Sequence, residues 1–191
     1  YESIAKYNLK KHEEAIGVLN EGKELIIENN FLLARFYSLL GDIYHDIKND
    51  TKSDFFYEKS ISKDSTNIYL LNNYSYYLSL RSSNLERALL LIKKALSESP
   101  NNPSFLDTYA WVLFKMNRPQ ESLTQIMKAL SFDKNNPTLL DHYGDILCSL
   151  KDPEKARKVW QKSLDILNKK TDVEKEKITN INDKIINNNC E

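Results

Sequence analysis

The 191-residue sequence contains few of the residues that interrupt helices, with only 4 glycines and 5 prolines. Glycine and proline are the least favourable residues inside a helix, so their scarcity favours an all-α fold. Long hydrophobic runs are also missing, because the longest apolar stretches, such as residues 88–92, are far too short to cross a bilayer. We therefore expect an all-helical protein without a transmembrane segment.

An excess of charge of one sign is absent as well. The 27 lysines and arginines are balanced by 27 aspartates and glutamates. A neutral chain has no overall field that would attract a phosphate backbone, so nucleic-acid binding is disfavoured. The apolar content of 41% is sufficient for a hydrophobic core, and the length permits one or two domains.

Cysteine is represented only by Cys148 and Cys190, which lie far apart and form no metal-binding or Cys-x-x-Cys spacing. We interpret them as two separate thiols, one half-buried and one in the tail. So small a number of cysteines does not indicate a redox compartment.

Motifs for catalysis and cofactor binding are missing too. The glycines occur singly and form no phosphate-binding loop, and the sequence contains no nucleophile elbow and no paired cysteine and histidine. His45 and His142 each lie beside two aspartates, but a third and fourth metal ligand are not nearby. We predict no catalysis, no cofactor and no metal here. Because Tyr1 already lies in a predicted helix, we expect an upstream segment, and a catalytic domain there stays open.

A repeat with a period of 34 residues is the strongest pattern that is present. The tripeptide Asn-Asn-Pro at residues 101–103 returns at 135–137, and Pro119 returns as Pro153. This period is typical of stacked helix-turn-helix units. It predicts full repeats at about 34–67, 68–102, 103–136 and 137–168, after a partial repeat at 1–29.

Small residues recur inside these repeats where two helices have to touch. Antiparallel helices approach to about 8–10 Å only when the contact positions are small. An isolated helical pair cannot bury its apolar face, so neighbouring pairs have to stack. Three such positions repeat in register: Gly41, Ser75, Ala110 and Gly144; Ser53, Ala88, Ser122 and Ala156; Ser60, Ala95, Ala129 and Ser163.

Residues 169–191 depart from the repeat. After a charged segment, Ile178, Ile181 and Ile185 recur at helical spacing and form one apolar stripe. We predict a capping helix that covers the last repeat, followed by a frayed tail. The alternative is a docking helix for another chain.

Residues 1–168 resemble the tetratricopeptide repeat family, since the small positions and several large ones recur in register. The sequence departs from the family at the first large position, where the frequent tryptophan is replaced by Tyr37, Leu71, Leu106 and Leu140. The resemblance implies an all-α, right-handed α-solenoid of helix-turn-helix repeats with a C-terminal capping helix. Residues 35–42, 71–74 and 107–113 are similar to tetratricopeptide proteins of Bacteroidetes-type bacteria, many of them envelope-associated. This similarity implies a periplasmic or envelope-associated location, and the alternative is the cytoplasm.

The resemblance also implies a binding groove, because the first helix of each repeat lines the concave side of such a stack. Cations that grip a peptide carboxylate in some family members are absent from the matching positions, so we predict a neutral or basic segment as the ligand. Alternatively, these charges are simply solvated and Trp111 packs against a neighbouring helix. The groove candidates are Asn72, Asn73, Tyr76, Asp107, Thr108, Trp111, Asp141, His142 and Asp145.

The predicted function is protein binding, as a scaffold or assembly factor that holds an extended peptide or a partner helix. Two alternatives remain. The chain could be the docking module of a larger enzyme, or a structural element that assembles with copies of itself as a homo-oligomer.

Overall fold

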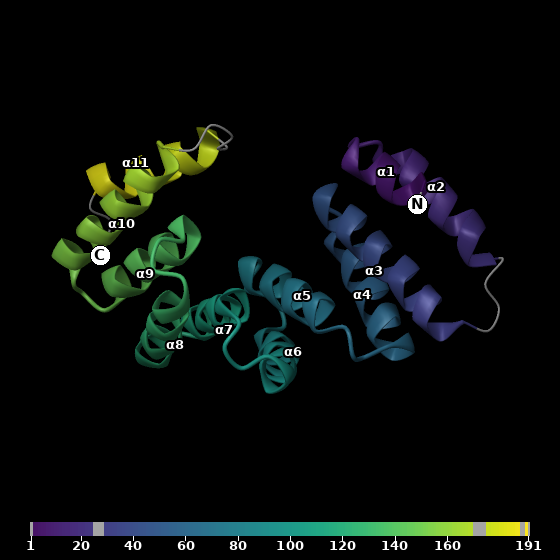
Figure 1. Ribbon diagram of the computed structural model, residues 1–191, viewed down its shortest axis with the longest axis horizontal. Helices are drawn as coiled ribbons and strands as arrows, with labels where there is room; N and C mark the ends of the chain where they lie inside the picture. Colours follow the sequence, from purple (N-terminus) through teal and green to yellow (C-terminus); the bar gives the residue numbers. More distant parts are fainter. Residues whose placement is uncertain (1, 25–28, 170–174, 188–189, 191) are drawn as a thin grey trace. The chain divides into compact units, whose positions relative to one another are not determined.

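The computed structural model describes residues 2–24, 29–169, 175–187 and 190, and within these ranges the chain is helical without any strand (Figure 1). Consecutive helices run in antiparallel pairs, as the 34-residue period predicts. The described helices are α1 (Glu2–Asn8), α2 (His12–Glu24), α3 (Asn30–Asp46), α4 (Asp50–Lys63), α5 (Ile68–Leu80), α6 (Leu85–Glu98), α7 (Pro103–Lys115), α8 (Pro119–Phe132), α9 (Pro137–Ser149), α10 (Pro153–Leu167) and α11 (Lys175–Asn187).

The helices form two compact units, Tyr1–Tyr77 and Leu78–Glu191, and the division falls within α5. Each unit has its own core. Tyr44 and Leu40 belong to the N-terminal core, whereas Ile126 and Trp160 belong to the C-terminal one. No described helix is both long enough and apolar enough to be a candidate membrane span.

Within each unit, the small positions lie between the two helices of a pair, as the pairs α3–α4, α7–α8 and α9–α10 show. In the N-terminal unit, Ser53 and Ser60 of α4 are buried against α3. Their hydroxyls donate hydrogen bonds of 2.9 Å to the carbonyl oxygen of Gly41 and 2.7 Å to that of Ala34. Each serine is therefore small enough for the contact and also forms an interhelical hydrogen bond, which we call a serine tie.

The same ties recur in the C-terminal unit. Ser122 of α8 donates a 2.7 Å hydrogen bond to the carbonyl of Ala110 on α7, and Ser163 of α10 donates one of 2.7 Å to that of Pro137 on α9. The sequence separations repeat those of the N-terminal unit, 12 residues for Ser122 and 26 for Ser163. Each tie therefore belongs to a fixed position of the repeat.

The asparagines of the Asn-Asn-Pro tripeptides begin the helices that follow them. Asn102 Oδ1 accepts hydrogen bonds from the backbone amides of Ser104 and Phe105, and Asn136 Oδ1 accepts from those of Thr138 and Leu139. The next residue is proline, whose missing N–H costs nothing in the first turn. One repeated tripeptide thus fixes the start of α7 and of α9.

A left-handed residue ends the first helix of each pair. Lys10, Lys48, Ser82, Asn117 and Lys151 all have positive φ, and each lies two residues beyond its helix. The residue after it donates a backbone hydrogen bond back into the last turn, as Asn49 does to Tyr44 and Asp152 to Leu147. This is the Schellman arrangement, which usually carries glycine at the left-handed position.

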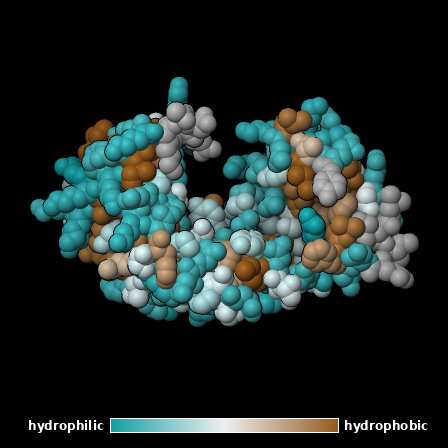
Figure 2. Space-filling view, viewed as in Figure 1, coloured by the Kyte–Doolittle hydropathy of each residue, from teal (hydrophilic) through white to brown (hydrophobic). Residues whose placement is uncertain are grey.

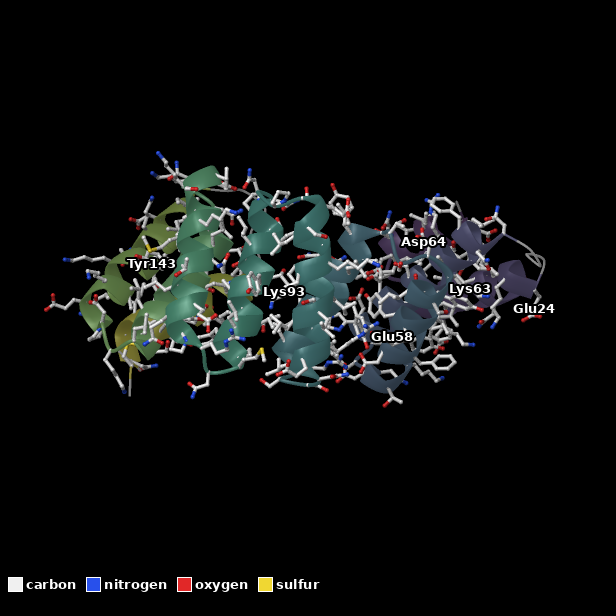
Figure 3. All side chains as sticks on the ribbon, turned by 90° about the horizontal axis from the view of Figure 1, so that it is seen from below. Glu24, Glu58, Lys63, Asp64, Lys93 and Tyr143 are labelled. Atoms are coloured by element: carbon white, nitrogen blue, oxygen red, sulfur yellow. A yellow bond between two sulfur atoms is a disulfide. The ribbon has the colours of Figure 1, made fainter. Side chains whose placement is uncertain are left out.

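The second helices of the pairs carry exposed charged side chains, such as Lys63 on α4 and Lys93 on α6 (Figure 3). Helix α11 covers the last pair with its apolar stripe. Ile181 is fully buried in a cluster with Trp160, Leu164 and Leu167. The viewed surface of the C-terminal unit is largely hydrophilic (Figure 2). The capping helix is therefore present.

The prediction of two separate thiols is wrong, because Cys148 and Cys190 form a disulfide. Helix α11 returns to the last pair and places the two Cα atoms 4.8 Å apart across a separation of 42 residues. The distance between two cysteines in the sequence does not show whether the chain folds back and brings them together. Cys190 is thus tethered to α9, and the rest of the predicted frayed tail beyond Asn187 lies outside the described residues.

Candidate interaction site

Three of the candidate groove residues lie on α5 and belong to the N-terminal unit. Asn73 is exposed, while Asn72 and Tyr76 are half-buried. The Asn72 amide donates a 3.3 Å hydrogen bond to Asn73 Oδ1. Asn72 Oδ1 is buried and accepts no hydrogen bond within the described part of the chain. Asn73 therefore presents an exposed amide, and the neighbouring Asn72 keeps a buried acceptor without a donor among the described residues.

The other six candidates belong to the C-terminal unit, where α7 and α9 bring three of them together. His142 Nδ1 lies 2.8 Å from Asp107 Oδ1, and the His142 ring stacks on the Trp111 indole with a centroid separation of 4.2 Å. Asp107, Thr108 and His142 are buried. These residues lie on two packed helices and use their polar groups on each other.

The groove candidate Trp111 is buried, since only 8% of it is exposed. It packs between His142 and Phe114, whose ring centroid lies 5.0 Å away, and Lys115 Nζ lies 4.9 Å from its ring centre. Trp111 Nε1 is buried and has no hydrogen-bond acceptor among the described residues. The alternative interpretation, packing against a neighbouring helix, describes this residue.

The buried Asp107–His142 pair is ionic in character. Burial works to lower the pKa of His142, but the neighbouring carboxylates, led by the charge and hydrogen bond of Asp107, together raise the pKa above its ordinary value. Asp141 and Asp145 add in the same direction. His142 is therefore positively charged over a wider pH range than a free histidine, and it neutralises Asp107.

Asp141 and Asp145 are held by a residue that the sequence analysis missed. Lys184 of α11 places its Nζ 2.8 Å from a carboxylate oxygen of each. Burial works to lower the pKa of Lys184, but the two carboxylates raise it above its usual value. The Trp160 indole N–H lies 3.2 Å from both Asp145 Oδ1 and the Asp141 carbonyl. Acidic residues that looked available to a ligand are therefore occupied by α11.

A pocket of about 440 Å³ opens beside this ion pair in the C-terminal unit. Aromatic and charged side chains line it together with the disulfide. Its lining residues are Phe114, Asp145, Cys148, Ser149, Lys151, Trp160, Lys184 and Cys190. It combines an apolar wall with fixed charges, as ligand-binding pockets commonly do.

The N-terminal unit contains a second pocket, of about 450 Å³, between α1, α2 and α3. Asp42 lies in its lining and accepts a hydrogen bond from the Tyr57 hydroxyl. Burial raises the pKa of Asp42 to about 6. No group of three or more potential metal ligands occurs within the described ranges, including around His45 and His142.

A clue to Lys184 was present in the sequence. The stripe of Ile178, Ile181 and Ile185 predicts the face by which α11 packs, and Lys184 lies beside that face. Its partners could not be found from spacing, because Asp141 lies 43 residues earlier in the chain.

Sequence and structure comparisons agree on the type of repeat. Family profiles described as "Tetratricopeptide repeat" match residues 69–174 and 34–67. No curated protein sequence matches the chain.

Among solved structures, the chain is similar to PilW, described as a widely conserved type IV pilus biogenesis factor, with a TM-score of 0.80, 12% identity, and coverage of 98% of this chain and 84% of that one. It is similar to PilF of Pseudomonas aeruginosa, with a TM-score of 0.70, 18% identity, and coverage of 97% and 85%. It is also similar to YrrB, a protein with an unusual peptide-binding site, with a TM-score of 0.68, 17% identity, and coverage of 87% and 84%.

Proposed function

Because the chain belongs to the tetratricopeptide repeat family, we propose that it is a non-catalytic interaction scaffold whose first-helix faces bind an extended peptide or a partner helix. The observation that carries this proposal is the recurrence, within each unit, of packed helical pairs with small contact positions, because such pairs present their first helices as an ordered surface. The peptide-binding site described for YrrB, which has a similar fold, supports the same type of ligand.

The partner contacts the accessible groove candidates in the N-terminal unit and Phe114, which was not among the candidates, in the C-terminal unit. Asn73 and Tyr76 of α5 serve the N-terminal unit, since Asn73 is exposed and its amide can bracket a peptide backbone. Phe114 serves the C-terminal unit from the wall of the 440 Å³ pocket. Beneath this surface lie the buried residues that hold it in place, namely Trp111, Asp107, Thr108 and His142. The bound segment is neutral or basic, because the candidate residues include no lysine or arginine that could hold a peptide carboxylate.

A site-specific photo-crosslinking experiment tests which face binds. A photoreactive amino acid is placed on a first helix of each unit, at Asn73 and at Ser104, which lies one turn before Asp107. Matched positions on second helices are Lys63 and Lys93, which are also exposed. In native lysate, Asn73 and Ser104 should give one discrete crosslinked partner and the two lysine positions none. Equal crosslinking from both kinds of helix would exclude the first-helix face.

A further inference from the structure

Helix α11 is attached to the last helical pair by a short apolar stripe and by a small set of side-chain contacts. It has 13 residues, and Ile181 is the residue of this helix that is fully buried. Ile178 and Ile185 are only partly buried. A helix this short is marginal in isolation, so its position depends on what fastens it.

Two features fasten it from one side. The disulfide joins Cys190, just beyond the helix, to Cys148 of α9. Lys184 forms 2.8 Å ion pairs with Asp141 and Asp145, and Lys177 Nζ lies 2.6 Å from Thr138 Oγ1. These polar attachments reach one face of α9, whereas the apolar stripe of α11 packs on α10, where Arg157 Nη2 also donates a 3.2 Å hydrogen bond to the Ile185 carbonyl.

We propose that the Cys148–Cys190 disulfide is a redox clasp that keeps α11 on an acidic helix-binding surface, and that reduction frees this surface for a lysine-bearing amphipathic helix of a partner protein. The proposal rests on the proposed scaffold function and names the ligand for one part of it.

The chemistry of the surface argues for this occupant. α11 shows what the surface accepts, namely a helix with one apolar stripe and a lysine that reaches both carboxylates. When α11 leaves, Asp141 and Asp145 lose their counter-charge and become the row of acceptors that the sequence suggested. Burying two carboxylates without a cation is costly, so an incoming helix needs a lysine at the same place.

The geometry also gives a reductant access to the bond. Both cysteines line the 440 Å³ pocket, where Cys190 is half-buried and Cys148 is more deeply buried. A thiolate of an external dithiol attacks one sulfur, breaks the S–S bond and forms a mixed disulfide; the second thiol of the reductant then displaces the protein sulfur. Two electrons and two protons pass to the protein, which leaves two cysteine thiols and an oxidised dithiol. Such bonds persist in oxidising compartments and are reduced elsewhere, so the two states match two environments.

Hydrogen exchange on the full chain tests the clasp. Amides of residues 175–187 should exchange about tenfold faster or more after reduction with dithiothreitol than in the oxidised chain. The Cys148→Ser/Cys190→Ser variant should match the reduced chain under both conditions. Amides of α7 and α8 serve as the internal control and should not change. Equal protection of α11 in oxidised and reduced chains would overturn the clasp.

Peptide binding tests the exposed surface. The probe is a fluorescent peptide with the sequence of residues 175–187, and the protein is the Lys184→Glu/Cys190→Ser variant, whose own α11 is weakened. The peptide should bind this variant at least about tenfold more tightly than it binds the oxidised natural chain. A peptide with glutamate in place of Lys184 should lose the same factor.

The possible results separate the two proposals. Absence of peptide binding, with α7 and α8 still protected, would overturn the helix-binding surface. The crosslinking at Asn73 and Ser104 does not depend on α11, so it tests the scaffold function independently.

Discussion

Gly144 lies against the indole of Trp160, and a Cβ atom added to this glycine would stand 2.2 Å from Nε1. Gly41 lies against Tyr57 in the same way, and both glycines precede their aromatic partner by sixteen residues. A Cβ atom added to Gly41 would come within 3.0 Å of the phenol ring. At the equivalent place in the third full repeat, Ala110 and Ile126 are both fully buried in one cluster. The size of the first residue thus compensates for the size of the second.

This compensation predicts that Gly144→Ala strongly destabilises the natural chain but not a chain carrying Trp160→Ile. In the natural chain the methyl group displaces the indole and breaks its hydrogen bonds to α9, which should cost about 2–3 kcal/mol. In the Trp160→Ile background the change recreates the pair seen at Ala110 and Ile126. Urea unfolding followed by circular dichroism measures the four members of this double-mutant cycle.

Gly17→Ala is the matched control. Gly17 lies inside α2 with no atom within 4 Å of its added Cβ, so alanine should stabilise that helix by about 0.5–1 kcal/mol. If Gly144→Ala costs the same in both backgrounds, the compensation between the two positions is absent.

The serine ties give a second prediction. Ser122→Ala removes a buried 2.7 Å hydrogen bond to the Ala110 carbonyl while keeping the small size, so it should cost about 1 kcal/mol. Ser122→Val should cost more, about 1–3 kcal/mol beyond this, because the contact is overpacked. Urea unfolding measures both.

Ser131→Ala serves as the control, because Ser131 is exposed and bonds only within its own helix, to Lys128. Its effect should stay within about 0.5 kcal/mol. A Ser122→Ala variant as stable as the natural chain would show that the hydroxyl contributes only its size.

Most of the fold could be predicted from the sequence, because the repeat makes the same local rules recur. Asn102 and Asn136 begin equivalent helices, and Ser122 and Ala156 occupy equivalent contacts. The family resemblance followed from this regularity, and the capping helix followed from the apolar stripe of Ile178, Ile181 and Ile185. The predicted domain boundaries and groove residues remain predictions.

The features that could not be predicted are the ones that occur once. The Cys148–Cys190 bond and the contacts of Lys184 depend on how far α11 folds back, and no repeat records that distance. The burial of Trp111 could not be predicted either, because helical spacing assigns a residue to one face of a helix but does not show whether another side chain, here His142, covers it. Single long-range contacts therefore decide which of the candidate residues a ligand can reach.

The left-handed residue after α3 gives a third prediction. Lys48 has φ of 60°, a conformation that costs a residue with a Cβ roughly 1–2 kcal/mol. Lys48→Gly removes this cost and should stabilise the N-terminal unit by about 0.5–1 kcal/mol after the greater flexibility of glycine in the unfolded chain is subtracted. The local stability of α3 and α4 from hydrogen exchange is the measurement.

Lys59→Gly, inside α4, is the comparison, and it should lose about 1 kcal/mol because glycine is a poor helix former. Opposite signs for the two lysines are expected. A loss of stability in Lys48→Gly would contradict the assigned turn.

Asp42 gives a prediction on pH. Burial raises its pKa to about 6, from an ordinary value of 3.8, and the nearby Asp46 carboxylate adds to the effect, whereas the hydrogen bond from Tyr57 opposes it. The folded unit therefore binds a proton more tightly than the unfolded chain does. The stability that comes from this group is fully present below about pH 3.8 and is lost as the pH rises through about 6. The loss amounts to at most roughly 3 kcal/mol.

Asp42→Asn should thus stabilise the N-terminal unit at pH 7.5 and leave it almost unchanged at pH 3.5, because asparagine keeps an acceptor for the Tyr57 hydroxyl but carries no charge. Tyr57→Phe should do the opposite and steepen the loss, since the carboxylate then lacks its donor. The measurement is hydrogen exchange of α3 and α4 at several pH values, corrected for the intrinsic exchange rate. A difference between Asp42→Asn and the natural chain that does not grow with pH would mean that Asp42 is ionised in the folded unit as readily as in the unfolded chain.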